Sequence, residues 1–462
     1  MVIEIYNTMS RKKETFVPFE KGKVKIYSCG PTVYWYQHVG NMRTYVSNDL
    51  IRRVFLYNGF GVKQVINVTD VGHLTSDADT GEDKMEKAAK REGKKAKEIA
   101  KHYFDVFKKD LDRLNILEPE VWPHASQHIK EQIALIKNLE KKGFTYKTKD
   151  GIYFDTSKLK DYGKLARLNT EDLKAGKRVD IGEKKNKTDF ALWKLSEKPG
   201  ERQQEWKSPW GIGFPGWHVE CSAMSSKYLG KQFDVHTGGQ EHIPVHHTNE
   251  IAQSETAFGK KPWVRYWIHF AWLLFKGEKV SKSKGGLYTL SELEEKGYDA
   301  LSFRYFCLLK SYRKPLNFTV ESLNSSMTSY KRLKEMVSKL KKSRDKKNKK
   351  NIEGAKKMFV DIISDDFNSP NAIAFMWDIL RENKLNDAEK YELVLDFDKV
   401  FGLDLDKGDE IKIPHHVKKL VEEREAARKG KDWKKSDELR KKINKEGYSI
   451  DDTKDGTRVK KV

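Results

Sequence analysis

The chain has 462 residues and a formal net charge of +22 at pH 7, which favours a polyanionic partner such as nucleic acid over a merely solvated lysine surface. This length exceeds one ordinary hydrophobic core, so we expect roughly two to four domains. Three cysteines are too few for a disulfide framework, and no stretch has the apolar length of a signal peptide or a membrane span, so we expect a soluble, cytoplasmic protein.

The first predicted unit is a strand, a turn and a helix. Alternating residues at 24–28 indicate a strand, a Cys-Gly-Pro turn follows at 29–31, and apolar residues at helical spacing occupy 39–50. A second strand at 62–68 would complete a β-α-β unit of a parallel, nucleotide-binding sheet. Cys29 would then lie at the carboxyl end of a strand, where ligands bind in such sheets.

The start of the predicted helix is a candidate phosphate site. His38 and Gly40 fall where unpaired N–H groups and the positive end of the helix dipole favour an anion. The glycine leaves room for a nucleotide to approach the backbone. The sequence therefore predicts that a nucleotide binds at this turn.

Two helical regions and an inserted segment follow. The periodicity predicts a long helical region at 82–117, interrupted at Gly93, and a second helix at 127–142. A strand at 151–155 then belongs to an insertion that spans about 143–210.

Beyond the insertion the pattern returns to the sheet. The lysine- and glycine-rich stretch at 174–187 inside the insertion indicates a loop, whereas 233–236 and 264–275 indicate strands. We therefore expect two distant parts of the chain to complete one sheet.

The C-terminal third is mainly helical. An apolar stripe begins at Ser322, and the basic run at 331–350 is either a phosphate-contacting surface or a solvated helix end. An acidic linker at 404–409 precedes a final segment, 417–462, which should form two short helices broken near Gly430 and a terminal hairpin or coil.

Cysteine, histidine and glutamate suggest a metal site. On a helix, His246 and Glu250 lie four residues apart on one face and could both hold a metal, although such a pair is often only a polar helix face. Cys29 and Cys221 would add two thiolates, although buried cysteines are often small core residues. Two thiolates, one imidazole and one carboxylate suit zinc rather than calcium or magnesium.

A lysine-rich loop, KVSKSKGG, occupies 279–286. Its ammonium groups and hydroxyls could neutralise a polyphosphate leaving group. In a chain with this many lysines, an ordinary basic loop is the alternative.

Taken together, the motifs resemble a known family. HVGN at 38–41 and KVSKS at 279–283 are similar to the two signature motifs of class I aminoacyl-tRNA synthetases, usually written HIGH and KMSKS. CGPTVY at 29–34, GWHVECSAM at 216–224 and HHTNEIAQSE at 246–255 resemble the cysteinyl-tRNA synthetase family. The C-terminal motifs ARKGKDWKKSDELR and DDTKDGTR resemble that family's anticodon-binding domain, so the resemblance covers nearly the whole chain.

The resemblance implies an α/β fold with three parts. A Rossmann-like, parallel-sheet catalytic domain at 1–320 would carry the insertion and the KVSKS loop at 279–283. An α-helical bundle at 321–408 would contact tRNA. A small anticodon-binding domain would occupy 409–462.

The resemblance also implies a reaction. The chain would activate L-cysteine with ATP and Mg²⁺ and transfer the cysteinyl group to the 3′ end of tRNA(Cys). His38, Gly40 and Asn41 would contact ATP, and Lys279 and Lys282 would stabilise the departing pyrophosphate. His38 and the two lysines would thus be catalytic.

One zinc ion per chain is implied as well. Its ligands would be Cys29, Cys221, His246 and Glu250. The pocket for the amino acid would be lined by Cys29, Gly30, Thr69, Trp217 and His236. A hydrophobic pocket distinguishes near-isosteres such as cysteine and serine by only about 10- to 200-fold, whereas zinc strongly prefers a thiolate. Because four protein ligands normally close a zinc site, we expect Glu250 to loosen.

Three features depart from the family pattern. Asn41 stands in place of the last histidine of HIGH and keeps a hydrogen-bond donor. Val280 replaces methionine at a packing position of KMSKS. The stretch at 71–83 differs from the short acidic run that is usual before the next helix, and it adjoins Thr69.

The tail contains candidate RNA contacts. On a helix, Trp433 and Asp437 share a face, with Arg428 before them and Asp452 after them. The indole could stack on an unpaired base while the carboxylates bind base edges and Arg428 contacts a phosphate or a base. The alternative is that Trp433 forms the core of a miniature domain.

Two other functions stay open at this point. One is the family's paralogue that joins activated cysteine to an amino sugar in thiol-cofactor synthesis, which lacks the anticodon-binding tail. The other is a noncatalytic RNA-binding relic, against which the intact His38, Lys279 and Lys282 argue. We expect the protein to be a monomer.

Overall fold

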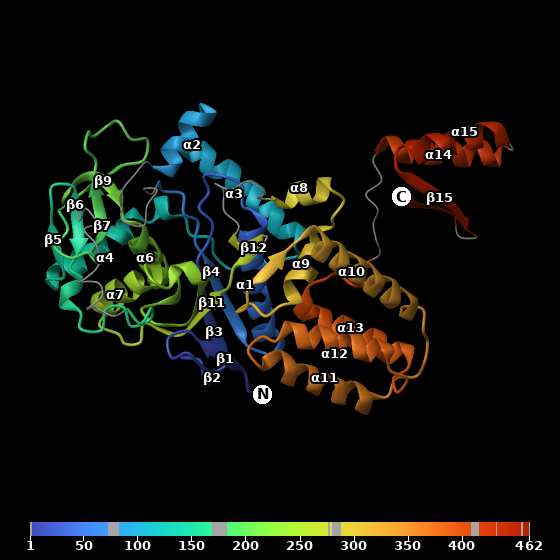
Figure 1. Cartoon of the computed structure of the whole chain (residues 1–462), viewed down its shortest axis with the longest axis horizontal. Helices are drawn as coiled ribbons and strands as arrows, with labels where there is room; N and C mark the ends of the chain where they lie inside the picture. Colours follow the sequence, from blue (N-terminus) through green and yellow to red (C-terminus); the bar gives the residue numbers. More distant parts are fainter. Residues whose placement is uncertain are drawn as a thin grey trace. The chain divides into compact units, whose positions relative to one another are not determined.

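The computed structural model describes residues 2–72, 83–168, 183–275, 278–279, 288–407, 415–430, 432–453 and 456–461. The chain folds as two compact units, Met1–Asp404 and Leu405–Val462 (Figure 1). In the described part of the chain, no helix has both the length and the apolar character that crossing a membrane requires.

A four-stranded parallel sheet forms the centre of the first unit. In spatial order its strands are β11 (Val264–Phe270), β10 (Phe233–Gly239), β3 (Lys23–Ser28) and β4 (Gly61–Ile66). All three strand pairings are parallel. The prediction that two distant parts of the chain complete one sheet is therefore confirmed, as is the α/β fold class.

Helix α1 (Val39–Tyr57) connects β3 to β4 and completes the predicted β-α-β unit. Its apolar stripe is buried, as the spacing of Val39, Met42, Val46 and Leu50 indicates. Since Ser28 of β3 pairs with Thr237 of β10, the carboxyl ends of the two central strands lie side by side. The residues that follow these strands are thereby brought together.

Further helices belong to the same part of the first unit as the central sheet. They are α2 (Lys84–Glu92), α3 (Ala96–Arg113), α4 (Ile129–Lys141), α6 (Trp217–Leu229) and α7 (His246–Phe258). Gly93 ends α2 with a φ of 64°, a left-handed conformation that glycine adopts without a steric cost. The predicted break at Gly93 is thus confirmed.

The insertion is a five-stranded antiparallel sheet. Its strands are β5 (Thr145–Lys147), β6 (Gly151–Phe154), β7 (Phe190–Leu195), β8 (Trp206–Ser208) and β9 (Gly211–Pro215), in the order β5-β6-β7-β9-β8. The sheet extends to Pro215, beyond the end near residue 210 expected from the sequence. That expectation was wrong because residues 209–210 form the turn between two paired strands, not the exit from the insertion.

Two smaller sheets complete the β structure of the first unit. A hairpin consists of β1 (Glu4–Asn7) and β2 (Lys12–Thr15). The other sheet contains β12 (Leu273–Phe275), β13 (Glu278–Lys279) and β14 (Leu316–Phe318). β12 follows the central strand β11 closely, so this sheet continues from the carboxyl end of the main one.

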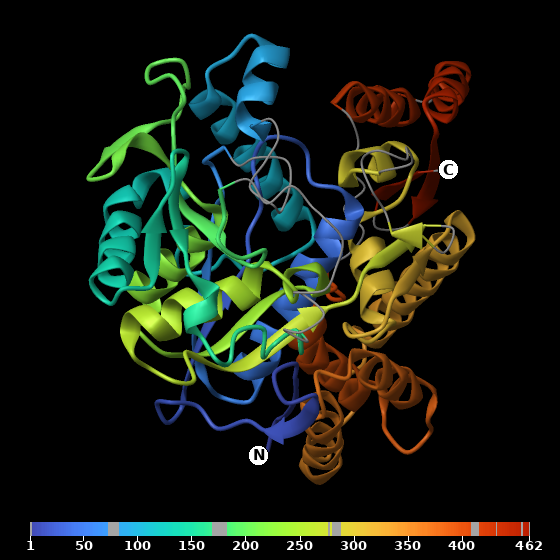
Figure 2. The ribbon, with the colours of Figure 1, turned by 60° about the vertical axis from the view of Figure 1, so that its left-hand side comes forward.

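The rest of the first unit is helical. Its helices are α8 (Leu290–Glu295), α9 (Ala300–Leu308), α10 (Val320–Leu340), α11 (Lys349–Ser364), α12 (Ser369–Arg381) and α13 (Asp387–Phe401). Figures 1 and 2 show the bundle α10–α13 and the insertion on different sides of the central sheet.

A buried ion pair ties α1 to the bundle. Asp49 of α1 accepts a hydrogen bond from the guanidinium of Arg304 on α9, and both side chains are fully buried. Nε of Arg304 also donates to the carbonyl of Phe401 at the end of α13, at 2.6 Å. Arg53 adds a second guanidinium 2.6 Å from the Asp49 carboxylate.

We expect Asp49→Asn to lower the free energy of unfolding of the first unit by about 3–5 kcal/mol, because a buried guanidinium would lose its charge partner. Urea unfolding at pH 7 measures the loss. Glu120→Gln is a matched control, since Glu120 pairs with Arg52 but its side chain is 37% exposed, and it should cost about 1 kcal/mol or less. Equal losses in the two variants would contradict this account.

The same pair sets a pH dependence. Burial alone would raise the pKa of Asp49, but Arg304 and Arg53 outweigh burial and hold the pKa below its ordinary 3.8. A carboxyl with a depressed folded pKa stabilises the protein above its unfolded pKa and loses this contribution as the pH falls through the folded pKa. The contribution is therefore complete at neutral pH.

The second unit is a helical pair with a hairpin. It contains α14 (His415–Lys429), α15 (Trp433–Lys445), β15 (Tyr448–Thr453) and β16 (Gly456–Lys461). The strands pair antiparallel. Val417, Ile443, Tyr448 and Ile450 form its buried core. The predicted pair of helices and terminal hairpin is confirmed.

Candidate functional site

A cavity of about 740 Å³ opens where β3 ends and α1 begins. Cys29, Gly30, His38, Gly40 and Asn41 are among the residues that line it. The structure thus brings the predicted nucleotide residues to the same cavity as the first predicted metal ligand.

Two glycines beside the cavity pack closely against neighbouring atoms. A Cβ atom on Gly30 would lie 1.6 Å from the carbonyl oxygen of Asn67, and one on Gly40 would lie 2.9 Å from the imidazole of His38. Neither position accommodates a larger side chain without displacement of its neighbour. Glycine here is a requirement of the packing.

His38 is the N-cap of α1. Its Nδ1 accepts a hydrogen bond from the backbone N–H of Asn41 at 3.3 Å, and the Asn41 side-chain oxygen accepts one from the His38 N–H at 3.2 Å. This reciprocal pair is a capping box. Asn41, which departs from the family motif, therefore has a structural role that the sequence did not indicate.

Thr69, which follows β4, makes backbone hydrogen bonds to the turn after β3. Its backbone N–H donates to the carbonyl of Pro31 at 3.0 Å, and its own carbonyl accepts from the N–H of Val33 at 3.2 Å. Its hydroxyl accepts from Asn67 at 3.0 Å. Thr69 holds the turn in place and is not among the residues that line the cavity.

Four potential metal ligands meet at the base of the site. Cys29, Cys221, His246 and Glu250 are all buried, and their donor atoms lie within 4.8 Å of one another. Cys29 follows β3, Cys221 lies on α6, and the other two lie on α7, where Nε2 of His246 is 2.7 Å from a carboxylate oxygen of Glu250. Two sulfurs, a nitrogen and an oxygen at this spacing fit zinc.

Two members of the cluster, Cys221 and Glu250, have lowered pKa values. A hydrogen bond from Cys29, with help from His246, lowers the pKa of the Cys221 thiol to about 6 although burial opposes this shift. Burial also disfavours charge on Glu250, but His236 and His246 lower its pKa to about 2. One thiolate and one carboxylate are thus favoured at neutral pH, whereas the raised pKa values of Cys29 and His246 mean that both must lose a proton when a metal binds.

His246 is held from three directions. Burial lowers the pKa of this imidazole, but the Glu250 carboxylate and Cys221 outweigh burial and raise it to about 10. Its Nδ1 lies 3.0 Å from Nδ1 of His218, and the ring of Trp217 stacks on it at 4.2 Å between centroids. Trp217 therefore orients a ligand, and it does not line the described cavity.

His236 also contacts the cluster. It is fully buried on β10, and its Nε2 lies 2.7 Å from Glu250. Its ring stacks on Trp267 with centroids 4.7 Å apart. The structure places it against the ligand set and away from the open cavity.

A histidine chain that the sequence reasoning missed supports Cys29. Nε2 of His247 lies 3.2 Å from the sulfur of Cys29, and Nδ1 lies 2.8 Å from Nε2 of His269. His269 in turn contacts the hydroxyl of Thr8 at 2.8 Å. Burial holds the pKa of both histidines well below the ordinary value, so these rings are neutral. The adjacent pair His246-His247 was the available signal in the sequence.

The predicted pyrophosphate-binding lysines lie at the border of the described structure. The backbone of Lys279 belongs to β13, where it pairs with Leu274 of β12, and the neighbouring Leu273 lines the cavity. The side chain of Lys279 and all of Lys282 lie outside the described residues. The strand that leads to the KVSKS motif is nevertheless adjacent to the cavity.

The predicted RNA contacts belong to the second unit. Trp433 and Asp437 lie on α15, and the Trp433 side chain is 60% exposed, so the alternative that Trp433 forms the core of this unit is wrong. Arg428 is half-buried on α14. Asp452 lies on β15, and its side chain is outside the described residues.

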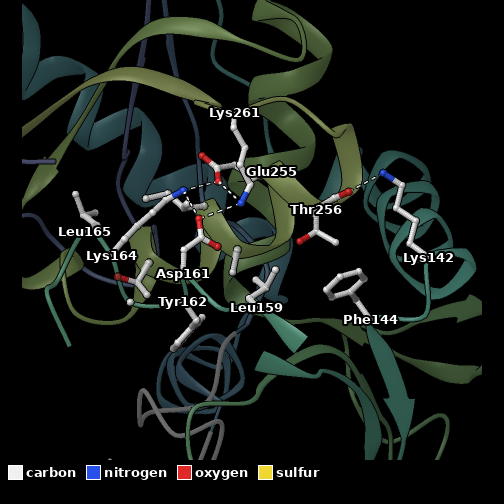
Figure 3. A pocket seen from close by; sticks show the side chains of 14 residues that line it. Lys142, Phe144, Leu159, Asp161, Tyr162, Lys164, Leu165, Glu255, Thr256 and Lys261 are labelled. Atoms are coloured by element: carbon white, nitrogen blue, oxygen red, sulfur yellow. Dashed lines mark hydrogen bonds and ion pairs between the residues drawn. The ribbon is translucent and has the colours of Figure 1, made fainter. Parts of the chain in front are cut away.

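A second cavity, of about 490 Å³, lies between the insertion and the outer face of α7 (Figure 3). Both of its carboxylates are paired with lysine, since Lys164 lies 2.5 Å from Glu255 and 3.1 Å from Asp161. No predicted site residue lines it. The chemistry therefore belongs to the first cavity.

The chain is similar to known families along most of its length. The family described as tRNA synthetases class I (C) catalytic domain matches residues 15–328. The cysteinyl-tRNA ligase anticodon binding domain matches residues 412–459.

Individual proteins show the same likeness. Cysteine–tRNA ligase 1 of Burkholderia lata is 47% identical over 99% of this chain and 97% of its own length. The cysteine–tRNA ligase of Treponema denticola is 40% identical over the full length of both chains. Among solved structures, a methionyl-tRNA synthetase of Mycobacterium tuberculosis, in complex with methionyl-adenylate, superposes with a TM-score of 0.56 over 82% of this chain and 90% of its own. At 12% identity this likeness concerns the fold alone.

Proposed function

The chain belongs to the cysteine–tRNA ligase family of class I aminoacyl-tRNA synthetases, and on that premise we propose how its own residues perform the reaction. The protein is an aminoacyl-tRNA ligase that joins cysteine to tRNA, and neither the amino-sugar ligase nor the RNA-binding relic is favoured. We propose two steps: cysteine and ATP form cysteinyl-adenylate and pyrophosphate, and the cysteinyl group then passes to the 3′ end of tRNA(Cys).

The observation that carries this assignment is the position of the four-ligand cluster next to the turn at the start of α1. Cys29 belongs to both, since it is a member of the cluster and lines the cavity that contains His38. A cysteine bound at the cluster would therefore present its carboxylate near the phosphates of ATP. The protein supplies position and charge, and no covalent nucleophile is needed.

ATP is proposed to bind at the N-terminus of α1. The N–H groups and dipole of the first helical turn favour phosphate, and Gly40 leaves the backbone accessible. His38 and Asn41 are locked by their capping box, so little ordering would accompany ATP binding. Lys279 and Lys282 would stabilise pyrophosphate as it leaves, with Mg²⁺ accompanying ATP.

The four buried ligands are proposed to select the amino acid. Bound to Cys29, Cys221, His246 and Glu250, one zinc ion would supply a soft Lewis acid that prefers a thiolate to a hydroxyl. The chain's own part is to hold these donors close together and oriented. Trp217 and His236 fix His246 and Glu250, and the neutral His247 fixes Cys29.

The tRNA contacts are proposed to lie in two places. Trp433 and Asp437 present an aromatic ring and a carboxylate on the surface of the second unit, which unpaired anticodon bases require, with Arg428 and Asp452 as further contacts. The basic run at 331–350 would contact the phosphate backbone. The domain division at 320 and 408, a monomeric state and a cytoplasmic location stay predictions.

We expect Lys282→Ala to reduce cysteine-dependent ATP–pyrophosphate exchange by about 100-fold or more while cysteine binding changes little. The loss of one charge-stabilising donor has an effect of this size, and the ammonium group would act on the leaving group only. Exchange kinetics and equilibrium binding of cysteine measure the two quantities. A parallel loss of both would contradict a role confined to the leaving group.

Two assays test the function as a whole. ATP–pyrophosphate exchange that depends on cysteine separates the enzyme from an RNA-binding relic. Charging of a tRNA(Cys) transcript separates the tRNA ligase from the amino-sugar ligase. Exchange without charging would refute the proposed second step.

A further inference from the structure

An aromatic strip forms part of the rim of the active-site cavity. Tyr34, Gln37 and His38 line the cavity, and Trp35 and Tyr36 lie between them in the sequence. Trp35 packs on a buried core cluster, whereas the side chain of Tyr36 is 38% exposed. The ring of Tyr36 is thus flanked in the sequence by cavity-lining residues and is open to solvent.

The ring of Tyr36 is held by three neighbouring rings. It makes T-shaped contacts with Tyr103, Trp35 and His102 at centroid distances of 5.0, 5.5 and 6.4 Å. Tyr103 is buried and anchored by a 2.5 Å hydrogen bond from its hydroxyl to Glu92. Among the described residues, Tyr36 has no stacked aromatic neighbour. A base that stacked on this ring would therefore meet a preorganised surface.

Positive charge surrounds the strip. The guanidinium of Arg91 lies 3.9 Å from the ring centre of Trp35, and Lys84 at the start of α2 lines the cavity itself. Exposed basic residues continue along α2 and α3. They are Lys87, Lys90, Arg91, Lys94, Lys95, Lys97 and Lys101. This surface has the charge that a phosphate backbone requires.

The reaction itself identifies the partner. The terminal adenosine of tRNA must reach the cavity in which cysteinyl-adenylate forms, and the nucleotides next to it are unpaired. Proteins hold unpaired nucleotides by stacking bases on aromatic rings within a basic groove. We propose that Tyr36, supported by Trp35 and Tyr103, is a stacking platform for the unpaired 3′ end of tRNA. This inference rests on the proposed function.

The test separates the ring from the hydroxyl. Tyr36→Leu should raise the KM for tRNA(Cys) in charging by about 5- to 100-fold, which is the range expected for one lost base-stacking contact. Cysteine-dependent ATP–pyrophosphate exchange does not involve tRNA and should stay within about twofold of wild type, since no adenylation contact is removed. Tyr36→Phe keeps the ring, so this variant should charge tRNA(Cys) with the KM of the wild type. An equal defect in Tyr36→Phe would overturn the stacking role.

Phe19 provides a matched control. Its side chain is 39% exposed and a guanidinium, that of Arg265, lies 3.9 Å from its ring, but neither sequence neighbour of Phe19 lines the active-site cavity, whereas Gln37 beside Tyr36 does. Phe19→Leu should charge tRNA like wild type. Equal defects in Phe19→Leu and Tyr36→Leu would show a general effect of removing an exposed ring and would overturn the proposal.

A shortened transcript identifies the part of tRNA that is bound. Removal of the unpaired 3′ nucleotides should weaken the binding of tRNA(Cys) to wild type by the same factor as Tyr36→Leu, and it should weaken binding to Tyr36→Leu no further. Additive losses would place the contact elsewhere and refute the proposal. If wild type performed exchange but charged no tRNA, the proposed function would fail instead, and the two failures are thus distinguishable.

Discussion

Cys221→Ser should release zinc and lower the preference of the enzyme for cysteine over serine. The substitution replaces a soft thiolate by a hydroxyl that stays protonated at neutral pH, so one of four ligands is lost. We expect zinc affinity to fall by more than about 100-fold, since changes to groups that merely orient a ligand already cost 10- to 100-fold. Metal analysis of the purified protein and ATP–pyrophosphate exchange with cysteine and with serine measure the two effects.

The remaining discrimination has a physical upper limit. A pocket that recognises its substrate by shape alone separates near-isosteres by about 10- to 200-fold, so the ratio of the two exchange rates should fall into that range. A metal-free protein that kept the full cysteine preference would refute the role of the cluster.

Cys307→Ser is the matched control. Cys307 is the third cysteine of the chain, it is buried on α9, and burial raises the pKa of its thiol to about 12. It is not a member of the four-ligand cluster. This variant should therefore keep zinc and selectivity, and it controls for the general effect of placing a hydroxyl in a buried cysteine site.

Local patterns in the sequence sufficed for the central sheet and for most of the ligand cluster. Alternation at 24–28 and helical spacing at 39–50 depend only on neighbouring residues, and both elements were found as expected. The i, i+4 spacing of His246 and Glu250 needs only a helix to become a contact, and α7 provides it. Cys29 and Cys221 were added as soft donors, and only the resemblance implied the complete set, because no spacing links residues so distant in sequence.

Features that depend on tertiary contacts escaped sequence reasoning. The chain from Cys29 through His247 and His269 to Thr8 joins four elements of the fold, and none of these residues has a local signal for its partner. The buried pair of Asp49 and Arg304 is of the same kind, since single charged residues on two helices look like surface residues in a sequence. Such contacts follow only from the packing of helices and strands against one another.

The four ligands and the histidines that support them differ in charge. Burial keeps His247 and His269 neutral, while the opposite charges within the cluster keep Glu250 ionised. The hydrogen bond with His247, which His269 supports, orients the sulfur of Cys29. This explains why the ligands can be named from a motif, whereas their support comes from unrelated segments.

Deletion of residues 411–462 should leave cysteine-dependent ATP–pyrophosphate exchange nearly intact and strongly weaken tRNA charging. The residues that line the active-site cavity and the cluster of ligands all belong to the first unit, Met1–Asp404. The second unit has its own small core. We expect charging efficiency to fall by about 100-fold or more, as the loss of two stacking or base-edge contacts would produce. Parallel kinetics of exchange and charging provide the measurement.

Asp437→Ala should cause the same defect in a milder form, together with weaker discrimination between the cysteine anticodon and others. A carboxylate that accepts hydrogen bonds from a base edge contributes to specificity as well as affinity, because a wrong base leaves it unpaired. Glu438→Ala is the control: Glu438 is also exposed and acidic, but it is the adjacent residue on α15 and points about 100° away around the helix. Equal effects of the two substitutions would indicate only a loss of negative charge, and unchanged charging by the truncated chain would remove the tail from tRNA recognition altogether.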